Sequence, residues 1–339
     1  MPVAARRIHM QNTQSTQSNA KPLVKEGDIK LAILGLTPGN GHPYSWSAIF
    51  NGYDEKRMTA ECPYPGIPEY LNKQPKDTLG IPGAHITHIC CTGTGEFEAE
   101  HVARCSLIPN VVDRPEDVIG KVDAVIIATD VGSEHVARSR PFVEAGIPLF
   151  VDKPLVDSAR DLATFDAWIA EGKPIMSGSS MRYSKEYLPY QASTWSLGEL
   201  RFVSVTCAKK WETYGIHALE GAYSIIGPGF VSCRNTGDED RNIVHFKHQN
   251  GVDLVVTVGK DMFGGFGLIT LVGTKDYACV MPKDSYYSFK TQLVKFVEYL
   301  RTGIRPFPYA ETEELMRMVI AGGLSREAGG KEIFLKDVL

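Results

Sequence analysis

The chain has 339 residues, of which 43% are hydrophobic and 22% are charged, and its formal net charge is −4. This length and balance are typical of a globular protein with two domains. No block of Lys and Arg exceeds a pair, and no apolar run is long enough to span a bilayer, so we expect neither nucleic acid nor a membrane as a partner.

The first residues of the chain and its cysteines both indicate the compartment in which the protein is expected to work. Residues 1–28 are expected to form a disordered tail, because residues 1–20 are rich in polar side chains and lack the apolar core of a signal peptide. The seven cysteines are odd in number and include no C-x-x-C pair. They favour free thiols in a reducing cytoplasm over disulfides or a zinc site, and we expect no metal.

Residues 29–180 alternate short apolar runs with segments of helical pattern. The expected strands are 29–35, 84–91, 122–128, 148–151 and 175–176, and the expected helices are 44–50, 96–105, 133–145 and 158–171. Gly146 is expected to cap the third of these helices. Residues 52–83 are dense in Pro and Gly and predict a loop-rich insertion. The alternation predicts an α/β Rossmann domain with a doubly wound parallel sheet.

Residues 181–339 have a different pattern. The expected strands are 200–207, 243–248, 252–258 and 268–272, and amphipathic helices over 288–301 and 312–327 close the chain. The period-two alternation predicts an α+β domain with an open, mostly antiparallel sheet. Few helices are expected between these strands, which leaves an apolar sheet face to be covered by another copy, so we expect a homodimer or homotetramer.

The first turn between strand and helix is a candidate phosphate-binding loop. Its sequence is Gly35-Leu-Thr-Pro-Gly39-Asn-Gly41-His42. A glycine-rich turn before a helix lets the backbone approach a pyrophosphate. The glycines do not follow the G-x-G-x-x-G pattern, so an ordinary turn is the alternative interpretation.

The second strand ends at Cys91 and is followed by Thr92, with no acidic residue to bind the adenosine ribose of NAD. The choice between NAD and NADP therefore stays open. The residues expected to bind the nucleotide are Gly35, Thr37, Gly39, Gly41, His42, Thr92, Thr129, His135, Lys153 and Pro154.

Lys153 and His217 are candidates for the chemical step. A lysine at the end of a strand can hydrogen-bond a reacting hydroxyl and stabilise charge as a hydride leaves, and the proline after it is a candidate for a cis bond. A histidine suits a base that takes the alcohol proton. The alternatives are a solvated lysine and a structural histidine; His217 with Glu220 would also be a helical metal pair, but it lacks a third ligand.

The densest run of recognisable motifs lies between Asp123 and Leu155. It holds Asp123-Ala-Val-Ile-Ile-Ala-Thr129, then His135, then Glu144-Ala-Gly-Ile-Pro-Leu-Phe-Val-Asp-Lys-Pro-Leu155. This stretch resembles the Gfo/Idh/MocA family, named for glucose–fructose oxidoreductase and inositol dehydrogenase, with Asp152 in place of the usual Glu. Weaker similarity continues at Met181-Arg-Tyr183, Leu197-Gly-Glu-Leu200 and Gly215-Ile-His217.

The resemblance implies a Rossmann domain over 29–180, a substrate and oligomerisation domain over 181–339, bound NAD or NADP, and a sugar or cyclitol substrate. It implies that Lys153 and His217 form the catalytic pair and that Arg182 and Tyr183 line the pocket. Thr213, also expected to contact substrate, stands where the family has an aspartate four residues before the histidine. Only Glu212 or Glu220 would then be left to orient His217.

We therefore expect an oxidoreductase that transfers a hydride from a secondary alcohol of a sugar, cyclitol or related polyol to NAD or NADP. One alternative is a transient redox step that allows elimination or glycoside cleavage without net nucleotide reduction. The other is a non-catalytic nucleotide-binding protein on a retired dehydrogenase fold, which the altered glycine loop and Thr213 favour.

Overall fold

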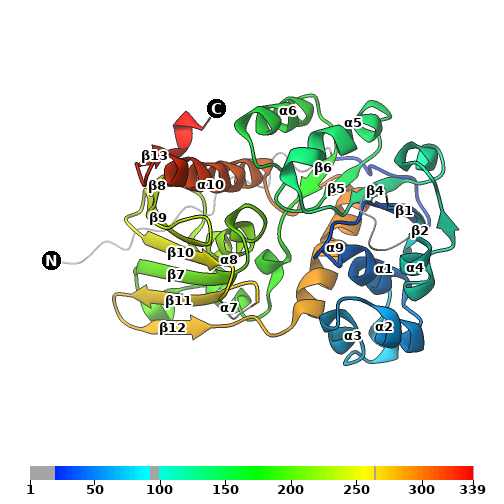
Figure 1. Cartoon of the computed structure of the whole chain (residues 1–339), viewed down its shortest axis with the longest axis horizontal. Coiled ribbons are helices and arrows are strands. Elements are labelled where there is room, and N and C mark those ends of the chain that lie inside the picture. The colour runs from blue at the N-terminus through cyan, green and yellow to red at the C-terminus, as the bar shows by residue number, and fades with distance from the viewer. Residues whose placement is uncertain (1–19, 92–98, 263–264, 339) are drawn as a thin grey trace.

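The computed structural model describes residues 20–91, 99–262 and 265–338, which form two sheets with helices packed around them (Figure 1). The first sheet has the strand order β3-β2-β1-β4-β5-β6, and all of its pairings are parallel. Its strands are β1 (Ile29–Leu34), β2 (Ala84–Cys90), β3 (Asn110–Val111), β4 (Ala124–Ile127), β5 (Leu149–Val151) and β6 (Ile175–Ser177). The predicted doubly wound parallel sheet is confirmed.

The order of these strands locates the place where a ligand would bind. The chain runs outward from β1 to β3 on one side and from β4 to β6 on the other, so the order reverses between β1 and β4. Open α/β sheets bind ligands in the crevice outside the carboxyl ends of the strands at this point. Both strands are almost wholly apolar and buried, which is typical of parallel strands covered on both faces.

The helices of this half are α1 (His42–Asn51), α2 (Glu55–Glu61), α3 (Gly66–Leu71), α4 (Ala99–Cys105), α5 (His135–Glu144) and α6 (Ala159–Ala170). The expected cap at Gly146 is found, with φ +71° directly after α5. The insertion at 52–83 is not merely a loop, because it contains α2 and α3. Asp54 caps α2 by accepting a hydrogen bond from the Arg57 N–H, a signal that the Pro and Gly content concealed.

The second sheet has seven strands in the order β12-β11-β7-β10-β9-β8-β13. Every pairing is antiparallel except that between β7 and β10, so the predicted mostly antiparallel sheet is confirmed. The strands are β7 (Leu200–Ala208), β8 (Phe230–Asn235), β9 (Arg241–His248), β10 (Asp253–Gly259), β11 (Leu268–Gly273), β12 (Tyr277–Val280) and β13 (Ile333–Phe334).

Helices cover one face of this sheet, contrary to the expectation that few would be available. They are α8 (Ile216–Ile226) and α10 (Tyr309–Glu327), with the short α7 (Leu188–Ala192) beside α8. Trp211 lies in the turn before α8, where its Nε1–H donates to the Val319 carbonyl of α10 at 2.8 Å. Its ring also packs on Phe246 of β9, so it joins the helices to the sheet.

The last long helix before α10, α9 (Ser285–Thr302), returns to the first sheet. Phe289 and Phe296 of α9 are buried in the same core as Trp46 of α1 and Phe150 of β5. Figure 1 shows α9 beside α1. Residues 181–339 therefore do not all pack on the second sheet, and a division into domains at residue 180 stays a prediction.

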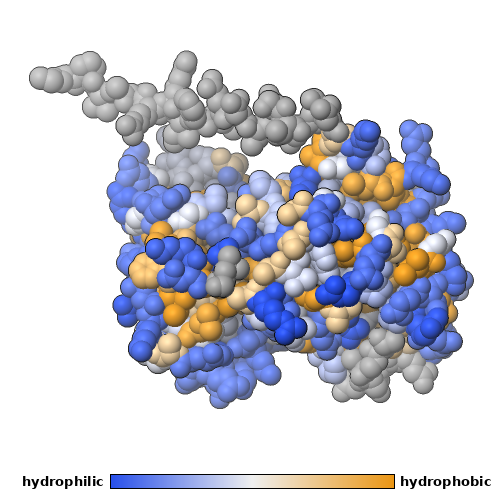
Figure 2. Space-filling view, turned by 90° about the horizontal axis from the view of Figure 1, so that it is seen from above, coloured by the Kyte–Doolittle hydropathy of each residue, from blue (hydrophilic) through white to orange (hydrophobic). Residues whose placement is uncertain are grey.

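The beginning of the described chain also packs on α9. The Leu23 N–H donates to the Leu300 carbonyl at 2.8 Å, and Leu23 and Val24 contact the first core. Leu23 and Val24, which lie within the expected tail, are therefore packed on α9, while the other residues of 20–28 are exposed and residues 1–19 lie outside the described chain. No helix in the described chain is both long and apolar enough to cross a membrane. Hydrophilic side chains cover most of the face seen in Figure 2.

Candidate functional site

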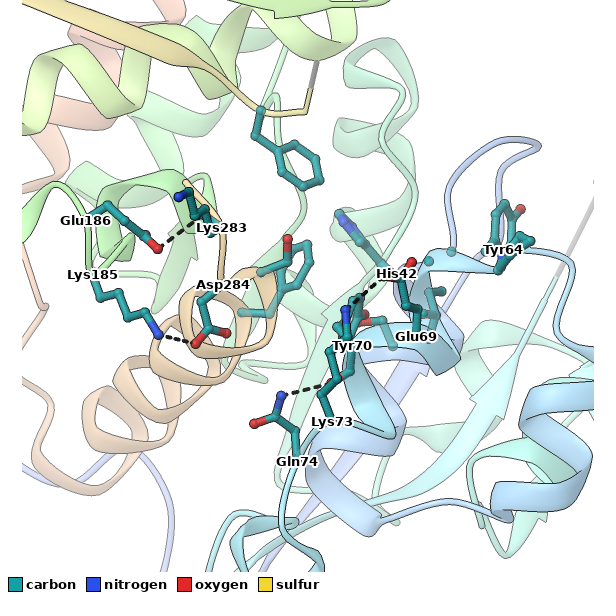
Figure 3. A pocket seen from close by; sticks show the side chains of 18 of the residues that line it. His42, Tyr64, Glu69, Tyr70, Lys73, Gln74, Lys185, Glu186, Lys283 and Asp284 are labelled. Atoms are coloured by element: carbon teal, nitrogen blue, oxygen red, sulfur yellow. Dashed lines mark hydrogen bonds and ion pairs between the residues drawn. The ribbon is translucent and has the colours of Figure 1, made fainter. Parts of the chain in front are cut away.

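A cleft of about 1010 Å³ opens beside the start of α1. His42 and residues 64–74, which include α3, form one wall (Figure 3). The opposite wall contains Lys185, Glu186, Lys283 and Asp284, the last of which caps the start of α9. The insertion expected as a loop thus supplies one side of the cleft.

Lys153 follows the carboxyl end of β5 and is only 3% exposed. Its Nζ donates to the Thr213 carbonyl at 3.3 Å and lies 3.7 Å from the nearest Asp130 carboxylate oxygen. It also lies 5.0 Å from the centre of the Tyr214 ring. The expected cis bond is present between Lys153 and Pro154. A buried ammonium group therefore lies at the carboxyl edge of the parallel sheet, where the sequence predicted it.

His217 lies in the first turn of α8 and is 1% exposed. Its Nδ1 lies 2.7 Å from the hydroxyl oxygen of Ser179, and its Nε2 has no hydrogen-bond partner among the described residues. Burial, followed by the charge of Lys153, lowers the pKa of His217 well below its ordinary value. The imidazole is therefore neutral at neutral pH, with one nitrogen held and the other free.

Ser179 orients His217 in place of the two acids considered from the sequence. Glu212 is bound to Arg326 at 2.7 Å, and Glu220 binds Arg182 at 2.6 Å and the Ser179 N–H at 3.1 Å. Neither carboxylate contacts His217, so both expectations are wrong, and Glu220 is not available as a metal ligand. A hydroxyl can donate to Nδ1 or accept from it, so Ser179 holds the ring without dictating its tautomer.

The Tyr214 ring brings the predicted catalytic pair together. Lys153 lies over it, and His217 meets it edge-on with ring centres 5.0 Å apart. Phe266 also meets His217 edge-on at 4.8 Å. Tyr214 and Phe266 line the cleft themselves, whereas Lys153 and His217 form the layer behind them. Sequence reasoning missed both rings, as well as Ser179. Tyr214 adjoins the Gly215-Ile-His217 motif but is not a residue type that indicates proton transfer there, and Phe266 and Ser179 belong to no local motif.

The glycine loop, residues 35–42, borders the crevice between β1 and β4, where buried polar groups lack hydrogen-bond partners in the described chain. Gly35 has φ +88°, and a Cβ there would lie 2.5 Å from Thr129 Cγ2, so only glycine fits between the two strand ends. The Oγ1 atoms of Thr37 and Thr129 are buried and have no partner among the described residues. Gly39 is exposed with open space around it. Buried hydroxyls of this kind normally have partners, so they fit a polar ligand at this position.

The start of α1 is tightly packed at Gly41 and is held by the side chain of His42. A Cβ on Gly41 would lie 2.5 Å from Ile67 Cδ1 of the insertion. His42 Nδ1 lies 2.5 Å from an Asp152 carboxylate oxygen, and the His42 ring stacks on Trp46 at 4.2 Å. His42 was expected to bind the nucleotide, but this nitrogen is already engaged by a residue of the Lys153 loop.

Asp152 connects His42 to Lys153. Its other carboxylate oxygen accepts the Lys153 backbone N–H at 2.7 Å, and the Asn40 side-chain amide donates to Asp152 at 3.2 Å. Burial acts to raise the pKa of Asp152, but His42 and then Lys153 outweigh it and hold the pKa below its ordinary value. The buried carboxylate is therefore charged, and it joins the glycine loop to the candidate catalytic lysine.

Several expected site residues have other roles or cannot be placed. Both ring nitrogens of His135 contact backbone carbonyls, those of Leu155 and Thr129, which leaves neither for a cofactor. Arg182 is enclosed by carboxylates and the Phe307 ring. The Tyr183 hydroxyl is buried without a partner in the described chain, and neither Arg182 nor Tyr183 lines the cleft. Thr92 lies outside the described residues.

One cluster away from the cleft contains atoms that could bind a metal. The potential ligand atoms of Glu61, His101 and Cys105 all lie within 4.8 Å of one another. His101 already contacts the Tyr44 hydroxyl at 2.6 Å and Glu61 at 3.2 Å, and burial raises the pKa of the Cys105 thiol to about 11. His101 and Glu61 therefore have hydrogen-bond partners without an ion, and the Cys105 thiol stays protonated at neutral pH.

No family model matches the sequence, and no curated protein matches it. Solved structures do match. The myo-inositol dehydrogenase from Corynebacterium glutamicum is 16% identical with a TM-score of 0.68, covering 91% of this chain and 99% of its own. The scyllo-inositol dehydrogenase from Lactobacillus casei, with bound NAD(H) and scyllo-inositol, is 11% identical with a TM-score of 0.69, covering 91% of this chain and 100% of its own.

A third match is GenD2 from gentamicin A biosynthesis in complex with NAD, which is 16% identical with a TM-score of 0.68 and covers 91% of this chain and 96% of its own. All of these identities are low, so the similarity concerns the fold. Nearly the whole of each neighbour is matched, including both sheets. The chain therefore has the two-domain fold of the inositol dehydrogenases, the fold that the Gfo/Idh/MocA resemblance in its sequence implied.

Proposed function

We propose that this protein is an oxidoreductase that uses NAD or NADP to oxidise a secondary alcohol of a sugar, cyclitol or related polyol. The observation that carries the proposal is the buried Nε2 of His217, which has no hydrogen-bond partner in the described chain and lies, like Lys153, against the Tyr214 ring at the carboxyl edge of the parallel sheet. A neutral imidazole next to a buried ammonium group is suited to removing a proton from an alcohol.

The pyridine nucleotide is assigned to the crevice between β1 and β4. The unpartnered hydroxyls of Thr37 and Thr129 would contact it there, and Gly35 and Gly39 would allow its close approach. Two structural neighbours contain NAD or NAD(H), which favours this nucleotide without excluding NADP. When bound, the nicotinamide supplies a hydride acceptor.

The chain itself supplies the remaining chemistry. His217 Nε2 accepts the hydroxyl proton while the C–H electron pair leaves as hydride, and the carbon–oxygen double bond forms. The Lys153 ammonium group stabilises the negative charge that develops on the oxygen. Ser179 holds the imidazole, and the rings of Tyr214 and Phe266 keep water from the pair.

A non-catalytic nucleotide-binding protein is the second candidate function. Two observations favour it. His42 and Asp152 are bonded to each other at the altered glycine loop, so His42 Nδ1 is not available to a nucleotide. The rings of Tyr214 and Phe266 also lie between the cleft and the proposed catalytic pair. Transient redox chemistry on the same fold would use the same residues as the dehydrogenase. Accumulation of reduced nucleotide in stoichiometric amounts with product distinguishes the dehydrogenase from both.

Nucleotide binding is tested through Thr129. Calorimetric titration should show that NAD or NADP binds, and Thr129→Val should weaken it by about twofold to tenfold, because one net hydrogen bond contributes about 0.5–1.5 kcal/mol. Thr164→Val on α6 removes a hydroxyl bonded only within its own helix and serves as the control. If neither nucleotide, oxidised or reduced, binds at millimolar concentration, the proposal fails.

Self-association is also proposed, on the basis of the sheet face that α8 and α10 leave uncovered. Phe202 and Ile243 are exposed on the strands either side of β10, and Leu268 and Tyr277 are exposed on β11 and β12. Exposed apolar side chains among polar ones on an uncovered sheet face favour an interface between copies. Light scattering should give a dimer or tetramer, and Ile243→Glu should shift it towards monomer. A monomeric mass for the unaltered protein at micromolar concentration would contradict this.

A further inference from the structure

Two lysines converge on the Tyr214 ring. Lys153 Nζ lies 5.0 Å from its centre, while Lys209 Nζ lies 4.2 Å from it and donates to the Tyr214 hydroxyl at 2.5 Å. Asp130 is 3.7 Å from Lys153 and also attracts Lys209, but Lys209 is not within ion-pair distance of any carboxylate in the described chain. Two positive charges thus lie against one ring with one nearby negative charge.

Lys209 has a positive φ angle, a backbone conformation that is often found at functional sites. Its φ is +71°, and within residues 20–91, 99–262 and 265–338 only Leu107 is a second non-glycine residue with positive φ. L-residues rarely adopt this conformation, and it persists where the surrounding structure enforces it, commonly at functional sites. The position directly follows β7 and lines the cleft, so it presents the ammonium group there.

The charges of the cleft do not balance around Lys209. Lys73 is paired with Glu69, and Lys185 is paired with Asp284. Lys283 also lines the cleft and, like Lys209, forms no ion pair in the described chain. The remaining acid, Glu186, accepts hydrogen bonds from the Lys283 backbone and from a serine hydroxyl. Partial burial of the ammonium group, followed by the charge of Lys153, lowers the pKa of Lys209 below its ordinary value, and the negative charge of Asp130 only partly opposes this.

We propose that Lys209 binds an anionic substituent of the substrate, so that this protein acts on an acidic or phosphorylated sugar or cyclitol rather than on a neutral one. The inference rests on the proposed function, because it takes the hydroxyl beside Lys153 and His217 as the reacting group. A carboxylate or phosphate on the same molecule would place its oxygens against Lys209 across the Tyr214 ring. A charge-assisted hydrogen bond of this kind is about twice as strong as a neutral one.

The pyrophosphate of the nucleotide is another possible source of the anion. The crevice proposed for it lies at the ends of β1 and β4, whereas Lys209 follows β7 of the second sheet. The substrate is therefore the favoured source. Measuring nucleotide affinity separately from sugar affinity distinguishes the two.

The test uses glucose, glucuronate and glucose 6-phosphate as matched probes, titrated calorimetrically into the NAD-saturated protein. At least one anionic probe should bind about ten to a hundred times more tightly than glucose, and Lys209→Gln should remove that preference while leaving NAD affinity unchanged. Lys209→Arg should restore it in part. Lys121→Gln, at an exposed position before β4 of the first sheet, should have no effect.

Three results would overturn the inference: glucose binding as tightly as both anionic probes, no binding by either anion at millimolar concentration, or a loss of NAD affinity in Lys209→Gln. Thermal melts confirm that each variant is folded. An anionic probe that binds through Lys209 without forming reduced nucleotide would contradict the proposed oxidoreductase but support the charge preference. Reduction of nucleotide by glucose alone would support the oxidoreductase but contradict the charge preference.

Discussion

Lys153→Met and His217→Asn are each expected to lower kcat by roughly a hundredfold to ten-thousandfold, the usual contribution of a general acid–base group. Methionine keeps the length of Lys153 and removes its charge, and asparagine keeps a polar group at His217 but removes the base. Nucleotide affinity should change much less, because the glycine loop and Thr129 are proposed to carry it. Steady-state kinetics with confirmed folding of each variant measures the effect.

The double variant should be little slower than either single one, since both residues serve one proton transfer. Ser179→Ala should lower kcat less and leave KM nearly unchanged, as expected of a residue that only positions His217. Because the pKa of His217 is lowered, the unaltered enzyme should keep its rate as the pH falls through 6.5, the ordinary histidine value. Near-normal turnover in both single variants would remove the pair from the mechanism.

His42→Ala is expected to lower the free energy of unfolding by about 1.5–3 kcal/mol, the usual contribution of a hydrogen bond to a charged group, because Asp152 keeps its bonds to the Asn40 amide and the Lys153 backbone N–H. Asp152 is 1% exposed, and His42 is the group that compensates its charge most strongly. The same change should lower kcat, because Asp152 accepts the Lys153 backbone N–H and would no longer be held by His42. Urea denaturation measures the stability effect.

Two further variants separate the causes. His42→Phe keeps a ring to stack on Trp46 but removes the partner of Asp152, so it should lose nearly as much stability as alanine. His85→Ala, at an exposed position on β2, should change stability by no more than about 0.5 kcal/mol. If His42→Phe is as stable as the unaltered protein, the hydrogen bond between His42 and Asp152 does not contribute as argued and the stacking on Trp46 does.

The strands of both sheets could largely be predicted from the sequence, because the signal for a strand is local. The run Ile-Lys-Leu-Ala-Ile-Leu of β1 and the alternation in β9 reflect how each strand is buried, on two faces or on one. Four strands of the described chain were missed. β3 and β13 have two residues each, which cannot show a period. β8 contains the polar residues Ser232, Arg234 and Asn235, and β12 has only four residues, so neither shows a clear strand pattern. Helix α8 was missed because it is apolar over most of its surface and has no side-chain cap.

The sequence by itself thus determined the two-sheet fold and the positions of Lys153 and His217, since strand periodicity and the Lys-Pro motif are local properties. Only the tertiary structure decided their partners. Ser179 reaches His217 across 38 residues of chain, and His42 reaches Asp152 across 110. Such contacts depend on how β6 packs near α8 and on how α1 meets the end of β5. They leave no spacing in the sequence, because any residue of suitable size and polarity at either position could satisfy them.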